Sequence, residues 1–323
     1  MKKRLILAAV AAIMTMTVAI AQQIAVVSEG GETSVYRSLE AAINGAEPGS
    51  VIYLPGGSFP VSDNVKITKR LTIIGIGHKY YNDNDNANGN TIIAGNLFFN
   101  EGSSSSSIMG CYITGDVNIG KDNSAVSNVL VKCCNTNSID SNGNCEYTTV
   151  NQNYIRSFVY LRGCNCSLSN NILHWIHYAN SSTICNNIII GGDYYISLVY
   201  VYNSNFYNNV FLNFTINTNY SGGNLANNNM FINNEWGDNS VNLTDCTWDD
   251  VFVNYNEGSI TPASNFHFKE AYKQYESQVG VYAGGVDFDK QMAPVPYIVA
   301  KRIAEETDAA GQLKIQVRVK AGD

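Results

Sequence analysis

The densest group of side chains that could do chemistry is the run from His174 to Tyr178, which reads HWIHY. In an extended strand alternate residues share a face, so Trp175 and His177 lie together and the other His takes the opposite side. That arrangement does not favour a metal site. Aromatic faces with polar tips suit carbohydrate surfaces, and further tyrosines follow closely. Trp175, His177, Tyr195 and Tyr200 are therefore the predicted ligand-binding residues, with packing between turns of the fold as the alternative.

Charged side chains are too scattered to predict a catalytic centre. Cleavage of a polysaccharide takes acidic and basic groups clustered on one face. Between residues 133 and 234 the charged residues are Asp140, Glu146, Arg156, Arg162 and Asp193. No spacing connects them, so no catalytic residue is predicted. A non-catalytic role is favoured over a lyase or hydrolase with an atypical site.

Residues 80–90, YYNDNDNANGN, are the weak candidates for a metal loop. Asp83 and Asp85 alternate with Asn as in the start of a calcium loop, but Gly95 stands where the closing Glu is needed. A solvated turn is the better interpretation. No metal and no cofactor is predicted.

The eight cysteines carry two interpretations. Seven fall between residues 111 and 185, and no Cys-x-x-Cys pair occurs. Free cysteines are often small buried core residues. In an exported chain they also suggest disulfides, and Cys145 with Cys164, 19 residues apart, is the pair predicted first.

The N-terminus predicts export. Lys2, Lys3 and Arg4 precede an apolar run, and Ala19-Ile20-Ala21 provides a cleavage site, so residues 1–21 are interpreted as a signal peptide. Removing three basic residues changes the net charge from −7 to −10. This charge argues against nucleic acid as a partner. No later segment is apolar enough to span a membrane, and periplasm, cell surface and medium stay open as destinations.

Composition predicts a folded, turn-rich chain. Charged residues make up 15% and hydrophobic residues 45% of the sequence, which excludes disorder. Asparagine is the outlier, at 42 of 323 residues, about 13%. Asn tolerates the left-handed backbone of sharp turns better than most residues do.

Many of the asparagines recur within an internal repeat. Six-residue units with an apolar residue at each end and, in most of them, Asn at one or both central positions begin at Ile108, Val126, Val150, Leu168, Ile184, Phe206 and Leu225. Short β-prone units near a 20-residue period predict a single right-handed parallel β-helix of roughly ten turns. Stacked asparagines at one bend are expected to hydrogen-bond along the axis. The predicted ladder comprises Asn128, Asn153, Asn170 or Asn171, Asn186 or Asn187, Asn208 or Asn209, and Asn227 or Asn228.

An amphipathic helix precedes the repeat. Ser38 is a good N-cap, and Leu39, Ala42, Ile43 and Ala46 recur on one face. Short β-branched segments follow, including residues 51–54 and 71–74.

These opening residues resemble a known family. The segments SLEAAIN from Ser38, GSVIYLPGG from Gly49 and LTIIGIG from Leu71 are similar to the start of secreted bacterial right-handed parallel β-helix proteins of the pectin-lyase-like superfamily. The resemblance spans residues 32–290 and implies that the helix caps the N-terminal end and that residues 263–289 close the other. The superfamily includes lyases, hydrolases and adhesins, so the resemblance implies a fold and not one activity.

The organisation expected is a signal peptide (1–21), a capped β-helix (22–290) and a C-terminal β-hairpin tail (291–323), in which alternation from Leu313 to Val319 marks one strand. The predicted function is an exported or cell-surface, non-catalytic scaffold or binder. Its expected partner is a polysaccharide or another surface macromolecule.

Overall fold

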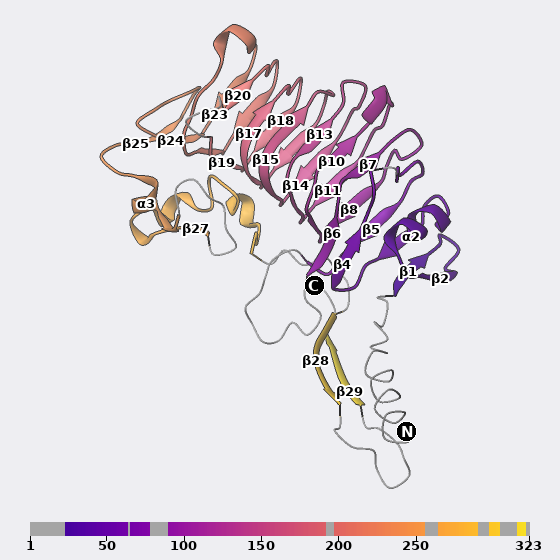
Figure 1. Cartoon of the computed structure of the whole chain (residues 1–323). Coiled ribbons are helices and arrows are strands. Elements are labelled where there is room, and N and C mark those ends of the chain that lie inside the picture. Colours follow the sequence, from indigo (N-terminus) through magenta and orange to yellow (C-terminus); the bar gives the residue numbers. More distant parts are fainter. Residues whose placement is uncertain are drawn as a thin grey trace, which may run out of the picture.

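The chain folds as an all-β right-handed parallel β-helix of about eight turns, which confirms the predicted fold class (Figure 1). The computed structural model describes residues 23–63, 65–77, 90–191, 197–255 and 264–289, and the backbone of 297–303 and 315–320. The predicted signal peptide lies outside the described residues. Turns are fewer than the ten expected, in part because one early turn is long: 35 residues separate Ile73 from its partner Ile108.

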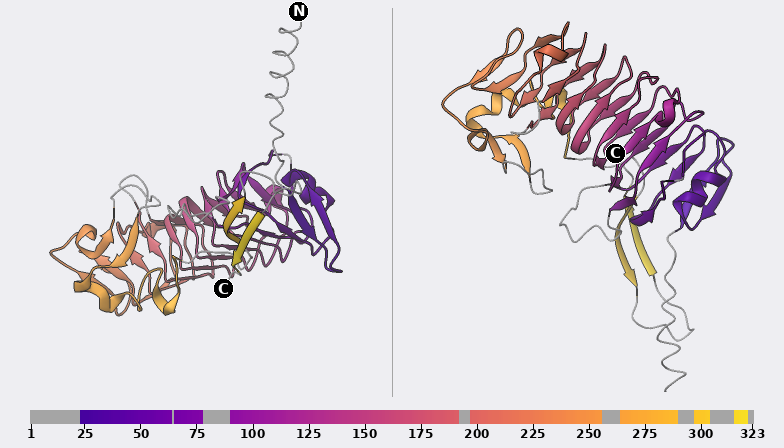
Figure 2. Two further views of the ribbon diagram at one scale, coloured as in Figure 1. Left: turned by 90° about the horizontal axis from the view of Figure 1, so that it is seen from below. Right: turned by 45° about the horizontal axis from the view of Figure 1, so that its top comes forward.

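One sheet runs the length of the helix. Its strands, in spatial order, are β2 (Thr33–Tyr36), β1 (Ile24–Val27), β3 (Val51–Tyr53), β5 (Thr72–Ile74), β8 (Ser107–Met109), β11 (Leu130–Lys132), β14 (Thr149–Asn151), β16 (Ser167–Ser169), β18 (Thr183–Cys185), β21 (Asn205–Tyr207) and β23 (Leu225–Asn227). From β3 onward each strand is parallel to the next, one turn further along. Neighbouring turns are therefore about 4.8 Å apart. Figure 2 shows these turns stacked along one axis.

The second sheet faces the first. Its main path is β4 (Gly57–Pro60), β6 (Thr91–Ala94), β9 (Tyr112–Ile113), β12 (Asn135–Thr136), β15 (Tyr154–Leu161), β17 (Ile172–His177), β19 (Ile188–Ile189), β22 (Val210–Phe211), β24 (Met230–Ile232) and β25 (Val241–Leu243). A branch through β7 (Leu97–Phe99), β10 (Val117–Ile119) and β13 (Ile139–Ser141) joins β15, and β20 (Leu198–Val199) joins β17. Inward Ile, Val, Leu and Phe side chains from both sheets form the core.

The strand register corrects the repeat at two units. Ile108 pairs with Val131, the last residue of the unit at Val126 and not its first, and Phe206 pairs with Ala226 rather than Leu225. The equivalent residues are Ile108, Val131, Val150, Leu168, Ile184, Phe206 and Ala226. Both errors have a local cause. In the turn that contains Val131, Cys134 stands where the other turns have Asn, and in the turn that contains Ala226, three consecutive asparagines (227–229) allow two alignments.

The buried asparagine ladder consists of Asn153, Asn171, Asn187, Asn209 and Asn229. The Nδ2 of each donates to the Oδ1 of the next at 2.9 to 3.0 Å. That Oδ1 also accepts the backbone N–H of the preceding Asn, and each Nδ2 donates to a backbone carbonyl one turn earlier. The side-chain amide oxygen and nitrogen of every ladder residue thus have a partner.

The first asparagine of each pair has a different task. Asn170, Asn186, Asn208 and Asn228 have φ between +52° and +58°, so they make the left-handed bend and the next residue makes the ladder. Asn128 is also left-handed but stands at another bend, level with Tyr147 and Asn165. Asn227 is exposed at the end of β23. Neither Asn128 nor Asn227 joins the ladder, which corrects their predicted place in it.

Both ends of the core are closed. Helix α2 (Leu39–Gly45) caps the N-terminal end, where Ser38 accepts a hydrogen bond from the Ala41 N–H and the predicted apolar face is buried. At the other end Trp236 packs on Phe206, Phe211 and Phe214, with ring centroids 5.0 to 6.2 Å away. Phe211 and Phe231 stack below it at 5.2 Å.

Residues 247–255 and 264–289, here called the C-terminal strap, pack along the side of the last turns. They include α3 (Trp248–Val251), β26 (Phe252–Asn254) and β27 (Asn265–Phe268). Their apolar side chains cover a column of outward residues that begins at Tyr154 and Ile172. In Figure 1 the strap lies beneath the turns, not beyond them. The expectation that it closes the end is therefore wrong, because the outer face of the second sheet is itself apolar here.

The predicted C-terminal hairpin is formed. Strand β28 (Tyr297–Ile303) pairs antiparallel with β29 (Ile315–Lys320). The register shifts once, between Ile298 and Ala300.

Replacing a ladder residue should destabilise the protein strongly. Asn187→Ala removes the acceptor of the buried Asn171 backbone N–H and one donor each from the carbonyls of Leu168 and Cys185, so we expect the free energy of unfolding to fall by about 3 kcal/mol or more. The matched control is Asn186→Gly, since φ at Asn186 is +58° and glycine adopts that conformation freely. Urea unfolding of both variants measures the difference. Equal losses would show that the ladder contributes nothing beyond the bend.

Candidate functional site

An aromatic cluster covers the outer face of β15 and β17, where the sequence places the predicted binding residues. Trp175 and His177 share this face, as expected from strand alternation. The Phe158 ring lies 4.7 Å from Trp175 and 5.0 Å from His177, and it stacks on Tyr160 at 5.3 Å. Trp175 and His177 are both half-buried. They are thus packed side chains with limited access to a ligand.

A tyrosine column follows the ends of these strands. Tyr178, Tyr200 and Tyr220 stand one above another on successive turns, with centroid distances of 4.9 Å and 5.1 Å. Tyr178 and Tyr200 are nearly parallel, at 5°. Their φ values of +61° and +56° place both at a left-handed bend, so the strand register stacks the rings. Because each ring covers its neighbour, the column shows edges and hydroxyls to solvent rather than flat faces.

Arg162 closes the column at its N-terminal side. The guanidinium lies over the rings of Tyr160 and Tyr178, 4.8 Å and 5.0 Å from their centroids. Nη1 also donates to both carboxylate oxygens of Asp140, at 2.6 and 2.7 Å. Burial raises the pKa of the Tyr160 phenol despite the nearby Arg162. Asp140 thus neutralises the Arg162 guanidinium, and the two tyrosine rings hold it in place by stacking.

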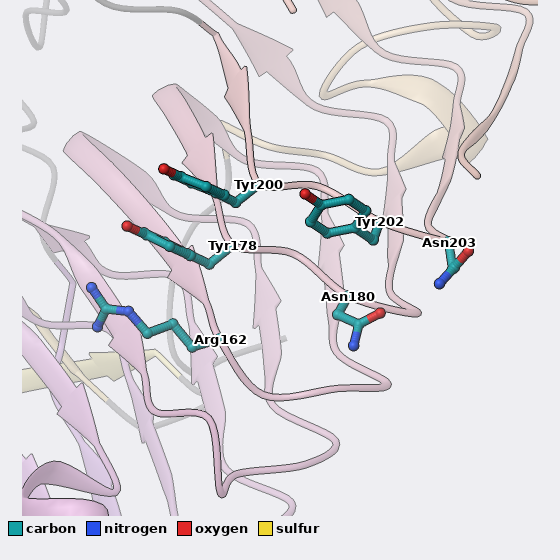
Figure 3. A pocket seen from close by; sticks show the side chains of 6 residues that line it. All are labelled: Arg162, Tyr178, Asn180, Tyr200, Tyr202 and Asn203. Atoms are coloured by element: carbon teal, nitrogen blue, oxygen red, sulfur yellow. The ribbon is translucent and has the colours of Figure 1, made fainter. Parts of the chain in front are cut away.

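The column forms one wall of an open groove, here called the tyrosine groove (Figure 3). Asn180, Tyr202 and Asn203 form the other wall. The groove has a volume of about 470 Å³, and its residues come from three successive turns, so it runs along the helix axis. Tyr202 is 40% exposed and Tyr200 37%. The groove is lined by Arg162, Tyr178, Asn180, Tyr200, Tyr202 and Asn203.

The predicted site residues divide into three groups. Tyr200 lines the groove, whereas Trp175 and His177 belong to the cluster beside it. Tyr195, Asp83 and Asp85 lie outside the described residues. Sequence reasoning missed Arg162 and Asn180 as groove residues. Arg162 follows β15 and Asn180 follows β17, and only the strand register shows that these two positions lie side by side.

The predicted Cys145–Cys164 disulfide is not formed, and none of the eight cysteines is part of a disulfide. Cys145 is buried, and its thiol faces the carbonyl of Ile119, 3.5 Å away. Cys164 is half-exposed, with its sulfur 3.4 Å from Glu146. The two side chains point to opposite sides of the wall. Within the described residues no three His, Cys, Asp or Glu side chains are grouped to hold a metal ion.

A second polar cluster lies in the C-terminal strap. The His267 Nε2 is 2.9 Å from Asp289 and its Nδ1 is 3.2 Å from Glu276. Tyr282 stacks on the imidazole at 3.9 Å and donates to Asp289. Burial and then Asp289 raise the pKa of Tyr282. These residues hold turns of the strap together, and no regular spacing in the sequence connects them.

No family model and no curated protein matches the chain. The β-helix is assigned from the strand register alone. None of the helices in the described part of the chain is long and apolar enough to cross a membrane.

Truncation should separate packed aromatic residues from exposed ones. Trp175 is half-buried against Phe158, so we expect Trp175→Ala to lower the free energy of unfolding by about 2 kcal/mol, less than the ~3–5 of a fully buried ring. Tyr220 is 49% exposed at the end of the column, and Tyr220→Ala should cost about 1 kcal/mol or less. Denaturant unfolding of both variants provides the comparison. A larger loss of unfolding free energy for Tyr220→Ala than for Trp175→Ala would contradict the assignment of Trp175 as packed and Tyr220 as exposed.

The strap should loosen in acid through Glu276. Burial alone would raise the pKa of this carboxyl, but hydrogen bonds from Lys273, the Phe268 N–H and His267 together lower it below its ordinary value of 4.5. A carboxyl with a lowered folded pKa stabilises the protein above the unfolded pKa, and this contribution is lost as pH falls through the folded pKa. Thermal melts across this range should show a steeper drop in Tm below pH 4.5 for the native protein than for Glu276→Gln. Parallel curves would assign the acid sensitivity to other groups.

Proposed function

We propose that this chain is an exported or cell-surface, non-catalytic β-helix protein of the pectin-lyase-like superfamily that binds glycan chains in the tyrosine groove. The observation that carries the proposal is the groove itself. Exposed tyrosines face two asparagine amides across an open channel, and none of the six lining residues is a carboxylate. Aromatic rings with hydroxyl and amide neighbours match the mixed apolar and polar surface of a sugar.

The direction of the groove supports a chain-like ligand. Its residues repeat with the turns of the helix, and the ring centroids of the column are 4.9 and 5.1 Å apart. An extended polymer lying along the axis would meet a stacked tyrosine, Tyr178 and then Tyr200, on each of two successive turns. Tyr202 has no described aromatic partner, so its ring is the one that offers a face to a sugar. The column contributes edges and hydroxyl groups.

The electrostatics favour an uncharged ligand. The only cation among the lining residues is Arg162, and Asp140 binds it through both oxygens. Attracting an acidic sugar would require breaking this pair. For the same reason the groove supports binding better than the alternative, polysaccharide cleavage, which needs a carboxylate or base free to exchange a proton with the substrate.

Export rests on the N-terminal sequence. The basic residues, apolar run and small-x-small site of residues 1–21 are the elements of a signal peptide. The polar, charge-poor surface of the exported chain is compatible with a glycan-rich environment. Mass determination of the N-terminus of protein secreted by the producing cell tests this part; a chain that begins at Met1 would contradict it.

Binding should depend on Tyr202. We expect neutral oligosaccharides of glucose, xylose, mannose or N-acetylglucosamine to include a ligand, and Tyr202→Ala to weaken its binding about five-fold or more through loss of one stacked ring. Calorimetric titration measures the effect.

The matched control is Tyr53→Ala on β3, which removes a ring of similar exposure, 37%, far from the groove. Its affinity should equal that of the native protein. Equal weakening by both variants, or no binding by any oligosaccharide in the panel, would refute the groove as a glycan site.

A further inference from the structure

Two cysteines occupy the place of the ladder asparagine in the turns before Asn153. Asn135 pairs with Tyr112, so the residues just before them, Cys134 and Cys111, are equivalent in neighbouring turns. The Asn135 N–H donates to the Cys111 carbonyl at 3.0 Å, and the Cys134 N–H donates to the Asn153 Oδ1 at 2.8 Å. The cysteines therefore continue the ladder column, where side chains point inward and no amide links the turns.

The spacing of the turns suits a covalent link. Parallel neighbours lie about 4.8 Å apart, and a disulfide joins Cα atoms about 4.4–6.8 Å apart. The Cys134 thiol faces the carbonyl of Ile108, in the turn that carries Cys111, at 3.8 Å and the Lys132 carbonyl at 3.2 Å. The Cys111 sulfur points toward Gly75, where an added Cβ would be 2.7 Å from it. A bond between the two sulfurs therefore requires Cys111 to adopt another side-chain rotamer than in the reduced protein.

No other two cysteines share this relation. All eight lie in the described residues, and only Cys111 and Cys134 stand at equivalent inward positions of adjacent turns. Cys164 pairs with Glu146 and Asn180, and the neighbours of Cys185 are likewise not cysteines.

We propose that Cys111 and Cys134 form a disulfide during oxidative folding, as a covalent rung that extends the asparagine ladder. The oxidant is a small or protein disulfide such as oxidised glutathione. One thiolate attacks the glutathione disulfide and releases one glutathione thiolate, which takes up a proton. The second thiolate then attacks the mixed disulfide and releases the other. The two cysteines lose two protons and two electrons, and one oxidised glutathione becomes two reduced molecules.

The bond forms before the turns close. Both side chains are fully buried in the folded chain. Burial raises the pKa of Cys134 to about 12 and that of Cys111 well above its usual range, so neither is a thiolate once packed. Because only the thiolate attacks a disulfide, the folded reduced protein resists oxidation at this site.

Refolding followed by peptide mapping tests the proposal without reference to glycan binding or export. The chain is unfolded, reduced and refolded in a mixture of reduced and oxidised glutathione, and free thiols are alkylated before trypsin digestion. Residues 80–121 contain Cys111 as their only cysteine, and residues 133–156 contain Cys133, Cys134 and Cys145. We expect these two peptides to be linked and about 2 Da lighter than the sum of their thiol forms.

Two matched variants identify the partner. The link should persist in Cys133→Ser and disappear in Cys134→Ser. The folded reduced protein, given the same oxidant, should keep Cys111 unlinked. Complete alkylation of Cys111 after oxidative refolding to the native circular dichroism spectrum, or a link that survives in Cys134→Ser, would overturn the proposal.

Discussion

The need to satisfy buried polar groups at one bend determines the rest of this structure. Each turn brings a backbone reversal into the core, where an unpaired N–H or carbonyl is costly. An asparagine amide supplies two donors and an acceptor, and it bonds the turns before and after its own. From Asn153 to Asn229, one ladder residue per turn therefore holds both the spacing and the register. Loop lengths vary between turns because nothing else has to repeat.

The same register organises the outside. Residues that follow β17 and β20 are forced into line, so Tyr178 and Tyr200 stack face to face as the asparagines do inside. Strand alternation alone places the predicted ligand-binding residues Trp175 and His177 together on one face. Stacking between turns instead buries the flat faces and leaves edges, hydroxyls and the separate Tyr202 ring available. The tyrosine groove results from the stacking of successive turns, so the sequence of a single turn does not predict it.

The sequence specifies the fold better than the site. The Asn-Asn units and the helix after Ser38 identify the capped β-helix because each is a local pattern with one physical meaning. The choice between Asn170 and Asn171 is not local: it depends on which amide meets its equivalent one turn away. The C-terminal strap is harder still, since Phe288 packs on Tyr154, more than a hundred residues earlier, and no periodicity connects them.

The C-terminal strap covers one part of the outer face of the second sheet, and the tyrosine groove lies beside another part. At its start, β17 presents Ile172, which the strap covers; just beyond its end Tyr178 is 37% exposed. Had solubility alone shaped this surface, charged side chains could have filled the exposed strip at little cost. Instead the strip holds stacked tyrosines and one neutralised arginine. Exposed aromatic surface next to an apolar column that the strap covers supports the proposal that this strip contacts another molecule.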